Sequence, residues 1–178
     1  MQQLGNDPKP AFEEQCEIVS ACLDNGIRLF DTTYYQERVA LGGILERLGR
    51  RGEAKIMTWN FFKQLGKEAD LVPYTPYEPH HLDMMLEELQ TDRIDTLVVH
   101  ADDDADRQRR GLELASDWME SWRVGSVALG MAKAWHLDVL PEGHSVGGVL
   151  IPYIAFAREA AEDALRHRAS QHAASASA

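Results

Sequence analysis

Polar side chains capable of acid–base chemistry follow a short apolar run in the segment FDTTYYQERVALGGIL. The carboxylate there is Asp31, and Tyr34 and Tyr35 follow it. A buried carboxylate costs free energy unless it is paired or hydrogen-bonded, so its place directly after an apolar run needs a reason. His100 ends the segment IDTLVVH, directly after its apolar stretch, and an imidazole there can donate, accept or carry a proton. These residues predict a polar site, and general acid–base catalysis is one interpretation of it.

Structural roles for the same side chains stay open. Asp31 could bond the backbone amides of the turn that follows it, and His100 could be a satisfied histidine at the edge of the core. Tyr34 and Tyr35 could simply cover the rim of a sheet. The adjacent histidines at 80 and 81 lack the ligand spacings of a closed zinc site, so no metal site is predicted.

Helical and strand patterns alternate along the chain. Apolar spacing predicts helices over residues 12–23, 41–48, 82–89, 112–122 and 157–165, with a short one over 135–140. Apolar runs predict strands over 27–30, 54–59, 94–100 and 126–131, and one more within 146–156. This alternation predicts a single α/β domain over residues 1–168, built on a parallel sheet. The low-complexity tail 169–178 is predicted to be disordered.

In parallel α/β folds, ligands gather at the carboxyl ends of the strands. Thr32, Thr58, Asn60 and Asp102 therefore join Asp31 and His100 as candidate site residues. No glycine-rich phosphate-binding motif follows any predicted strand.

Composition narrows the class of partner. The formal net charge of −11 disfavours nucleic acid and anionic membrane surfaces. No apolar run approaches the length of a membrane-spanning helix. Cys16 and Cys22 lie on different faces of a predicted helix, and no targeting segment is evident, so we expect a cytoplasmic protein.

Five segments, taken in order, resemble the aldo-keto reductases. DNGIRLFDTTYYQERVALGGIL is similar to the family's aGi..fDTA..Y......lG..L segment, and IMTWN stands at its TK strand. LEELQTDRIDTLVVHADD resembles L..L..dyiDl..iH.pd, while RVGSVALGM and VLIPYI resemble the two strands that follow. The likeness runs from Phe12 to Phe156. Because 178 residues is short for an eight-unit barrel of about 250, it implies an incomplete, TIM-barrel-like fold with about five or six parallel strands.

The resemblance implies reduction of a small carbonyl compound with NADP(H). In that family a tyrosine is the general acid, a lysine lowers its pKa, an aspartate pairs with the lysine and a histidine orients the carbonyl. Asp31 and His100 match the aspartate and the histidine. The tyrosine position holds Gln36, which leaves Tyr35 as the candidate acid, and the lysine position holds Trp59. Without the cation, proton-transfer catalysis is expected to fall by at least about 10²-fold.

The family's cofactor residues are also replaced. Its Ser-Asn pair aligns with Ala132 and Lys133, and its glutamine aligns with Leu150, so the cofactor-binding residues are unknown. Three hypotheses follow. The first is a divergent or truncated reductase with impaired or lost catalysis, using Asp31, Tyr35 and His100. The second is a non-catalytic module that binds a small carbonyl or aromatic ligand between Tyr34, Tyr35, Trp59, Asn60 and His100, or binds a protein.

The unpaired edge strands of an incomplete barrel favour partner binding, and we expect a homodimer. The third and weakest hypothesis is a lyase or isomerase that uses Asp31 and His100 as an acid–base pair.

Overall fold

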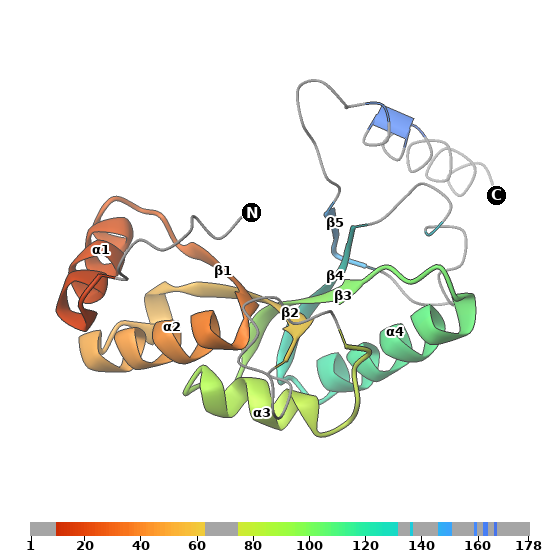
Figure 1. Cartoon of the computed structure of the whole chain (residues 1–178), viewed down its shortest axis with the longest axis horizontal. Helices are drawn as coiled ribbons and strands as arrows, with labels where there is room; N and C mark the ends of the chain where they lie inside the picture. Colours follow the sequence, from red (N-terminus) through yellow and green to blue (C-terminus); the bar gives the residue numbers. More distant parts are fainter. Residues whose placement is uncertain are drawn as a thin grey trace.

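The structure is a computed structural model, and it describes residues 10–62, 75–131, 136, 146–150, 159, 162, 163 and 166. Helices and strands alternate along this part of the chain (Figure 1). The strands are β1 (Leu29–Tyr34), β2 (Lys55–Phe61), β3 (Ile94–His100), β4 (Val124–Gly130) and β5 (Gly148–Leu150). The helices are α1 (Phe12–Asp24), α2 (Tyr35–Leu48), α3 (His81–Glu88) and α4 (Ala105–Glu120), with a 3-10 turn η1 (Arg51–Glu53).

The five strands form one parallel sheet in the order β1-β2-β3-β4-β5. This arrangement confirms the predicted fold class, a parallel α/β sheet that corresponds to part of a barrel. Helices α2, α3 and α4 lie along one side of the curved sheet, and α1 packs beside α2 (Figure 1). The carboxyl ends of all five strands therefore meet at one edge of the sheet.

The main hydrophobic core lies between the sheet and the helices. It contains Leu97 and Val99 of β3 and Leu82 and Met85 of α3, all almost completely buried. Because side chains alternate along a strand, the intervening residues face the opposite side of the sheet. On that inner face a second, smaller cluster forms around Trp59, Val98 and Ala128, with Met57, Phe61 and Leu150 packed against it.

Strand and helix bounds differ most from prediction at the starts of two helices. The helix predicted over 112–122 is α4, which begins seven residues earlier and runs over Ala105–Glu120. The other difference lies around the first polar segment. The strand predicted over 27–30 begins at Leu29 and runs on through the two threonines to Tyr34. The helix predicted from Leu41 begins six residues earlier, at Tyr35. The cause is local. Glu37 accepts hydrogen bonds from the backbone N–H groups of Thr33 (2.7 Å) and Tyr34 (3.0 Å), which caps the first turn of α2.

Other predictions fall partly on residues outside the described ones. The short helix over 135–140 and the tail 169–178 lie outside them, apart from residue 136, and the last helix is described at 159, 162, 163 and 166. The domain bounds 1–168 stay a prediction. None of the described helices is both long and apolar enough to cross a bilayer.

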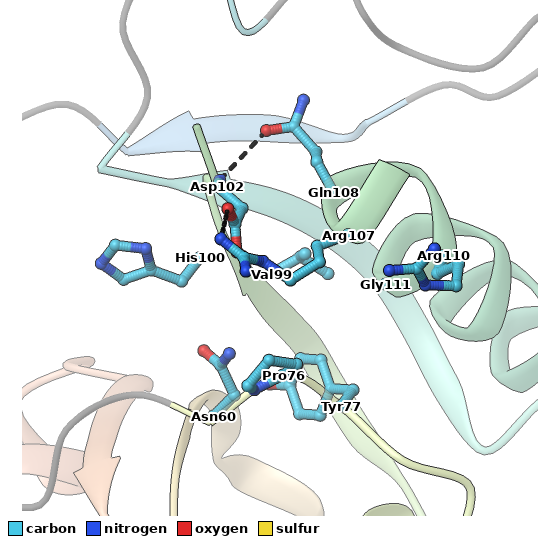
Figure 2. Close-up of a pocket in the computed structure, with 10 residues that line it drawn as sticks. All are labelled: Asn60, Pro76, Tyr77, Val99, His100, Asp102, Arg107, Gln108, Arg110 and Gly111. Atoms are coloured by element: carbon cyan, nitrogen blue, oxygen red, sulfur yellow. Dashed lines mark hydrogen bonds and ion pairs between the residues drawn. The ribbon is translucent and has the colours of Figure 1, made fainter. Parts of the chain in front are cut away.

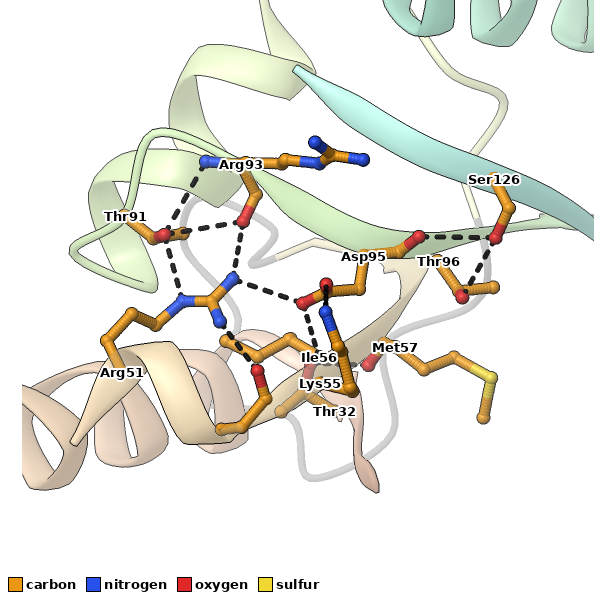
Figure 3. A network of polar contacts seen from close by, with 11 residues as sticks. Thr32, Arg51, Lys55, Ile56, Met57, Thr91, Arg93, Asp95, Thr96 and Ser126 are labelled. Carbon is orange, nitrogen blue, oxygen red and sulfur yellow. Dashed lines mark hydrogen bonds and ion pairs between the residues drawn. The ribbon is translucent and has the colours of Figure 1, made fainter. Parts of the chain in front are cut away.

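A polar network ties the sheet together near the starts of the strands, away from the candidate site (Figure 3). Its centre is Asp95 of β3. The carboxylate accepts hydrogen bonds from Lys55 Nζ (3.0 Å), the Ile56 backbone N–H (3.0 Å) and Arg51 (3.2 Å). Burial alone would raise the pKa of Asp95, but these hydrogen bonds and the charges of Arg51 and Lys55 outweigh it and lower the pKa. We infer that this network stabilises the fold and is not part of the candidate site.

Candidate functional site

The centre of the candidate site is a hydrogen bond between Trp59 and Asp31. Asp31 lies on β1 opposite Met57 of β2, so Trp59 is the next β2 residue with the same orientation. The indole Nε1–H of Trp59 donates to Oδ1 of Asp31 over 2.9 Å. The side chain that replaces the family's lysine therefore still reaches the aspartate, but it brings a neutral donor in place of a cation.

The indole of Trp59 extends in the other direction across the inner face of the sheet. A methyl group added to Gly130 of β4 would overlap its six-membered ring and would lie 2.6 Å from Cγ1 of Val98. Only glycine at 130 leaves room for a ring that spans from β1 across to β4. Trp59 is 9% exposed, so this ring fills most of the space available to it.

His100 ends β3 beside this indole. Its ring lies edge-on to Trp59 at a centroid distance of 6.5 Å and to Phe61 at 6.4 Å. Phe61 in turn makes an edge contact with Tyr34 at 5.4 Å. Nδ1 of His100 lies 2.9 Å from the carbonyl oxygen of Ala101. The inner face at the strand ends is thus a row of aromatic rings flanked by one carboxylate and one imidazole.

The environment of Asp31 favours its protonated form more than water does. Burial of the carboxyl group raises the pKa of Asp31, and the charge of Glu37 adds to this increase. The hydrogen bonds from the Trp59 indole and the Thr32 backbone act in the opposite direction and do not cancel it. This carboxylate is therefore not stabilised as one paired with an ammonium group would be.

The two tyrosines lie at the junction of β1 and α2. Tyr34 is the last residue of β1, and Tyr35 is the first residue of α2. Gln36, at the position of the family's catalytic tyrosine, lies in the first turn of the helix. Edge contacts between rings link Tyr34 through Phe61 to His100.

Arg38 is a residue that the sequence alone did not single out. Its side chain is completely buried, and it pairs with Glu88 of α3. Its guanidinium also donates to the carbonyl oxygens of Trp59 (3.2 Å) and Phe61 (3.0 Å). Arg38 thus holds the end of β2, the strand that carries Trp59. An arginine in a polar stretch normally reads as a surface residue, so the sequence carries no signal for this role.

A second polar group forms where β3 leads into α4. Asp102, which is buried, accepts two hydrogen bonds of 2.9 Å from Arg107, a bidentate ion pair. Gln108, also buried, accepts from the Asp102 backbone N–H and donates to the carbonyl oxygen of His136. These contacts fix the loop that follows His100.

Two cavities share His100, Asp102 and Arg107 in their linings. One, of about 190 Å³, lies between the end of β2 and α4 and includes Asn60 (Figure 2). The other, of about 370 Å³, also includes Met131 at the end of β4. Met131 has a left-handed backbone conformation with φ 56°, which is uncommon for a residue other than glycine.

The predicted site residues separate into two groups. Asp31, Trp59 and His100 come together on the inner face, with Tyr34 at its border. Asn60 points to the other side of β2 and lines the smaller cavity with His100. Thr58, also predicted, is buried and donates to the Thr32 carbonyl oxygen, a bond between β1 and β2. His81 stacks on Phe62 at 4.0 Å. Among the described residues no group of three or more His, Cys, Asp or Glu side chains could hold a metal ion.

The ends of β4 and β5 are where the resemblance places the nicotinamide amide. The described residues there are Gly130, Met131 and Leu150, and none carries a side-chain N–H or O–H group. Leu150 packs against the Trp59 cluster instead. Gly130, Met131 and Leu150 therefore offer no side-chain partner for a nicotinamide carboxamide, and Ala132 and Lys133, which align with the family's Ser-Asn pair, lie outside the described residues.

Comparison with known proteins supports the fold. No family model matches the sequence, and no curated protein matches it. Solved structures of aldo-keto reductases do match. A protein from Pseudomonas aeruginosa that is described as an aldo-keto reductase superposes with a TM-score of 0.71 at 21% identity, over 90% of this chain and 64% of that one. The glycerol dehydrogenase from Gluconobacter oxydans gives 0.70 at 18% identity, over 88% of this chain and 51% of that one.

An aldo-keto reductase from Bacillus halodurans, in its holo form, gives a TM-score of 0.65 at 19% identity, over 80% of this chain and 49% of that one. The described structure thus has the fold of part of an aldo-keto reductase, as the sequence resemblance implied. The chain spans about half to two thirds of the length of these proteins.

Proposed function

We propose that this chain is an aldo-keto-reductase-like oxidoreductase domain in which carbonyl reduction is lost or strongly impaired and binding of a small carbonyl or aromatic compound is retained. The observation that carries the proposal is the Asp31–Trp59 hydrogen bond beside His100. It keeps the aspartate and the histidine of the family's site and replaces the cation between them with an indole.

Each retained group has a chemical role in this proposal. With its Nδ1–H donated to the carbonyl oxygen of Ala101, His100 donates from Nε2 to a ligand carbonyl oxygen as the imidazolium. The rings of Trp59 and Phe61 pack against an apolar or aromatic substituent. The position of the family's lysine holds Trp59 in this chain, so no ammonium from that position activates the phenol of Tyr35. Proton transfer from a phenol without such a cation is slow. In this family NADP(H) supplies the hydride, and we infer that this chain binds it weakly or not at all.

Binding and chemistry are tested separately. Benzaldehyde should quench tryptophan fluorescence saturably, and His100→Ala should weaken that binding by about ten-fold, the cost of one good hydrogen bond. NADPH should give no saturable change in nicotinamide fluorescence below the millimolar range. Aldehyde-dependent oxidation of NADPH that Tyr35→Phe abolishes would instead show that Tyr35 is a working acid. Absence of benzaldehyde binding would remove the proposed ligand class.

A protein-interaction module is the second candidate. The observation that favours it is the exposure of apolar side chains along β1 and before it, with Leu29 58% exposed and Ile27 54% exposed. A second copy of the chain that pairs along this edge would give a homodimer. We further infer a cytoplasmic protein that binds neither nucleic acid nor membranes, given its net charge of −11. A monomeric mass in light scattering at micromolar concentration would contradict the homodimer.

A further inference from the structure

The smaller cavity has chemistry that the proposed carbonyl site does not use. It occupies about 190 Å³ between the end of β2, the segment before α3 and the first turns of α4 (Figure 2). Neither Asp31 nor Trp59 belongs to its lining. Its polar groups come from three elements that pack together in the described fold, so the arrangement is fixed by the fold itself.

Asn60 presents an unsatisfied acceptor to this cavity. The side chain is only 2% exposed, and its Nδ2 donates to the carbonyl oxygen of Thr75 over 2.8 Å. That bond sets the orientation of the amide, which turns Oδ1 to the remaining space (Figure 2). Oδ1 has no hydrogen-bond partner and is buried. Leaving such an acceptor unpaired costs about 1–3 kcal/mol, so the site favours a ligand with an O–H or N–H donor.

The same cavity carries an excess of positive charge. Two arginines of α4, Arg107 and Arg110, and one carboxylate, Asp102, belong to its lining. Arg107 and Asp102 neutralise each other through their bidentate pair. Arg110, one turn further along α4, makes no ion pair within the described part of the chain. In a protein with a net charge of −11, a pocket with an unmatched guanidinium is a local exception that favours an anion.

Size limits the ligand further. Liquid water occupies about 30 Å³ per molecule, so about 190 Å³ holds the equivalent of about six waters or one small organic acid. We propose that this cavity binds a small hydroxycarboxylate, with the hydroxyl group donating to Oδ1 of Asn60 and the carboxylate pairing with Arg110. His100 lines this cavity and also lies edge-on to Trp59, so this ligand would sit next to the proposed carbonyl site without occupying it.

The test is a titration of the isotope-labelled full chain with sodium L-lactate, followed by amide NMR shifts. We expect saturable shifts in the millimolar range at the end of β2 and the start of α4. Acetate lacks the donor and glycerol lacks the charge, so each should bind about ten-fold more weakly. Arg110→Gln should weaken lactate binding by a similar factor. Arg109→Gln is the matched control, because Arg109 is exposed, pairs with Asp106 and Glu113 and does not line the cavity.

Four results would overturn the proposal. Three are no saturable shifts with lactate, equal binding of acetate, and equal loss of binding in Arg109→Gln and Arg110→Gln. Inorganic phosphate that binds as tightly as lactate, dependent on Arg110 but unaffected by Asn60→Ser, would also overturn it, since the site would then be a simple anion site. The titration involves no aldehyde and no nicotinamide, so its outcome is independent of the function proposed above.

Discussion

Trp59 donates its indole N–H to Asp31 at the place where the family resemblance puts a lysine ammonium. A unit charge about 4 Å away contributes about 4 kcal/mol at an effective dielectric constant of about 20. A hydrogen bond to a charged acceptor contributes only about 1.5–3 kcal/mol. The indole therefore keeps a hydrogen bond to Asp31 but does not supply the attraction of a positive charge. This agrees with the raised pKa of Asp31.

Changing the donor at position 59 should change the pKa of Asp31 in a defined order. Trp59→Phe removes the indole hydrogen bond, which lowers the pKa in the wild type, so the pKa of Asp31 should rise further. Trp59→Lys should lower it, because an ammonium stabilises the carboxylate. Carboxyl-carbon NMR across a pH titration measures both. Trp118→Phe, at a buried tryptophan of α4, is the control and should leave Asp31 unchanged. An unchanged pKa in Trp59→Phe would mean that the indole bond does not form in solution.

Asp31→Asn should stabilise the protein at neutral pH. The folded-state pKa of Asp31 is raised above its unfolded value, so the charged form opposes folding above the folded pKa. That penalty disappears as the pH falls below the unfolded value of about 3.9. The gain should be small, because Asp31 is partly exposed to water. Thermal melts at neutral and acidic pH check the sign. A variant that is less stable at neutral pH would show that the carboxylate has a stabilising partner.

Asp95→Asn should have the opposite effect. The folded-state pKa of Asp95 is lowered, so its contribution to stability is present above the unfolded pKa of about 3.9 and is lost as the pH falls through the folded value. We expect a loss of about 1–3 kcal/mol at neutral pH, since Lys55, Arg51 and the Ile56 N–H lose a charged acceptor (Figure 3). Urea unfolding over a pH series gives the difference. A deficit that persists unchanged at low pH would point to packing instead.

The sequence predicted the regular elements better than the site. Strand β3 was predicted with its observed bounds, because IDTLVVH holds a continuous apolar stretch, Leu97 to Val99, and its ends coincide with the ends of the strand. The start of α2 was missed, since its first turn is polar and aromatic and is defined by the Glu37 cap. The Asp31–Trp59 bond depends on the register between β1 and β2. No local pattern reveals that register.

The unpaired side-chain oxygen of Asn60 could not be predicted from the sequence for a similar reason. It results from the position of Thr75, fifteen residues later, which takes the amide N–H and leaves the oxygen. The sequence did mark Asn60 as polar at a strand end, but it placed Asn60 with Trp59. Adjacent strand residues face opposite sides of a sheet, and that rule separates them.

Gly130→Ala should disturb the packing of the Trp59 side chain. A methyl group there overlaps the indole and lies 2.6 Å from Val98, so either the ring or the strand must move. Overpacking of this kind costs about 1–3 kcal/mol. The displaced indole should also lose its bond to Asp31, and Asp31 should then titrate as it does in Trp59→Phe. Gly52→Ala is the matched control, because a methyl group at 52 meets nothing within 4 Å. Wild-type stability in Gly130→Ala would mean that the ring does not lie over β4.

Arg38→Met should destabilise the protein more than any of these changes. The substitution keeps the length of the buried side chain but leaves Glu88 without its partner and the carbonyl oxygens of Trp59 and Phe61 without a donor. Breaking a buried ion pair costs about 3–5 kcal/mol. Because those carbonyl groups belong to the end of β2, benzaldehyde binding should weaken as well.

The matched control is Arg47→Met, at an exposed position in the last turn of the same helix. Denaturant unfolding of both variants gives the comparison. If Arg38→Met does not fold, Glu88→Gln supplies the milder test, since it retains a hydrogen-bond acceptor and removes only the charge. Equal stability of Arg38→Met and Arg47→Met would show that the guanidinium does not hold β2. A destabilised Arg38→Met that binds benzaldehyde normally would separate the role of Arg38 in the fold from the site, and Trp59 would then be positioned by Asp31 and Gly130 alone.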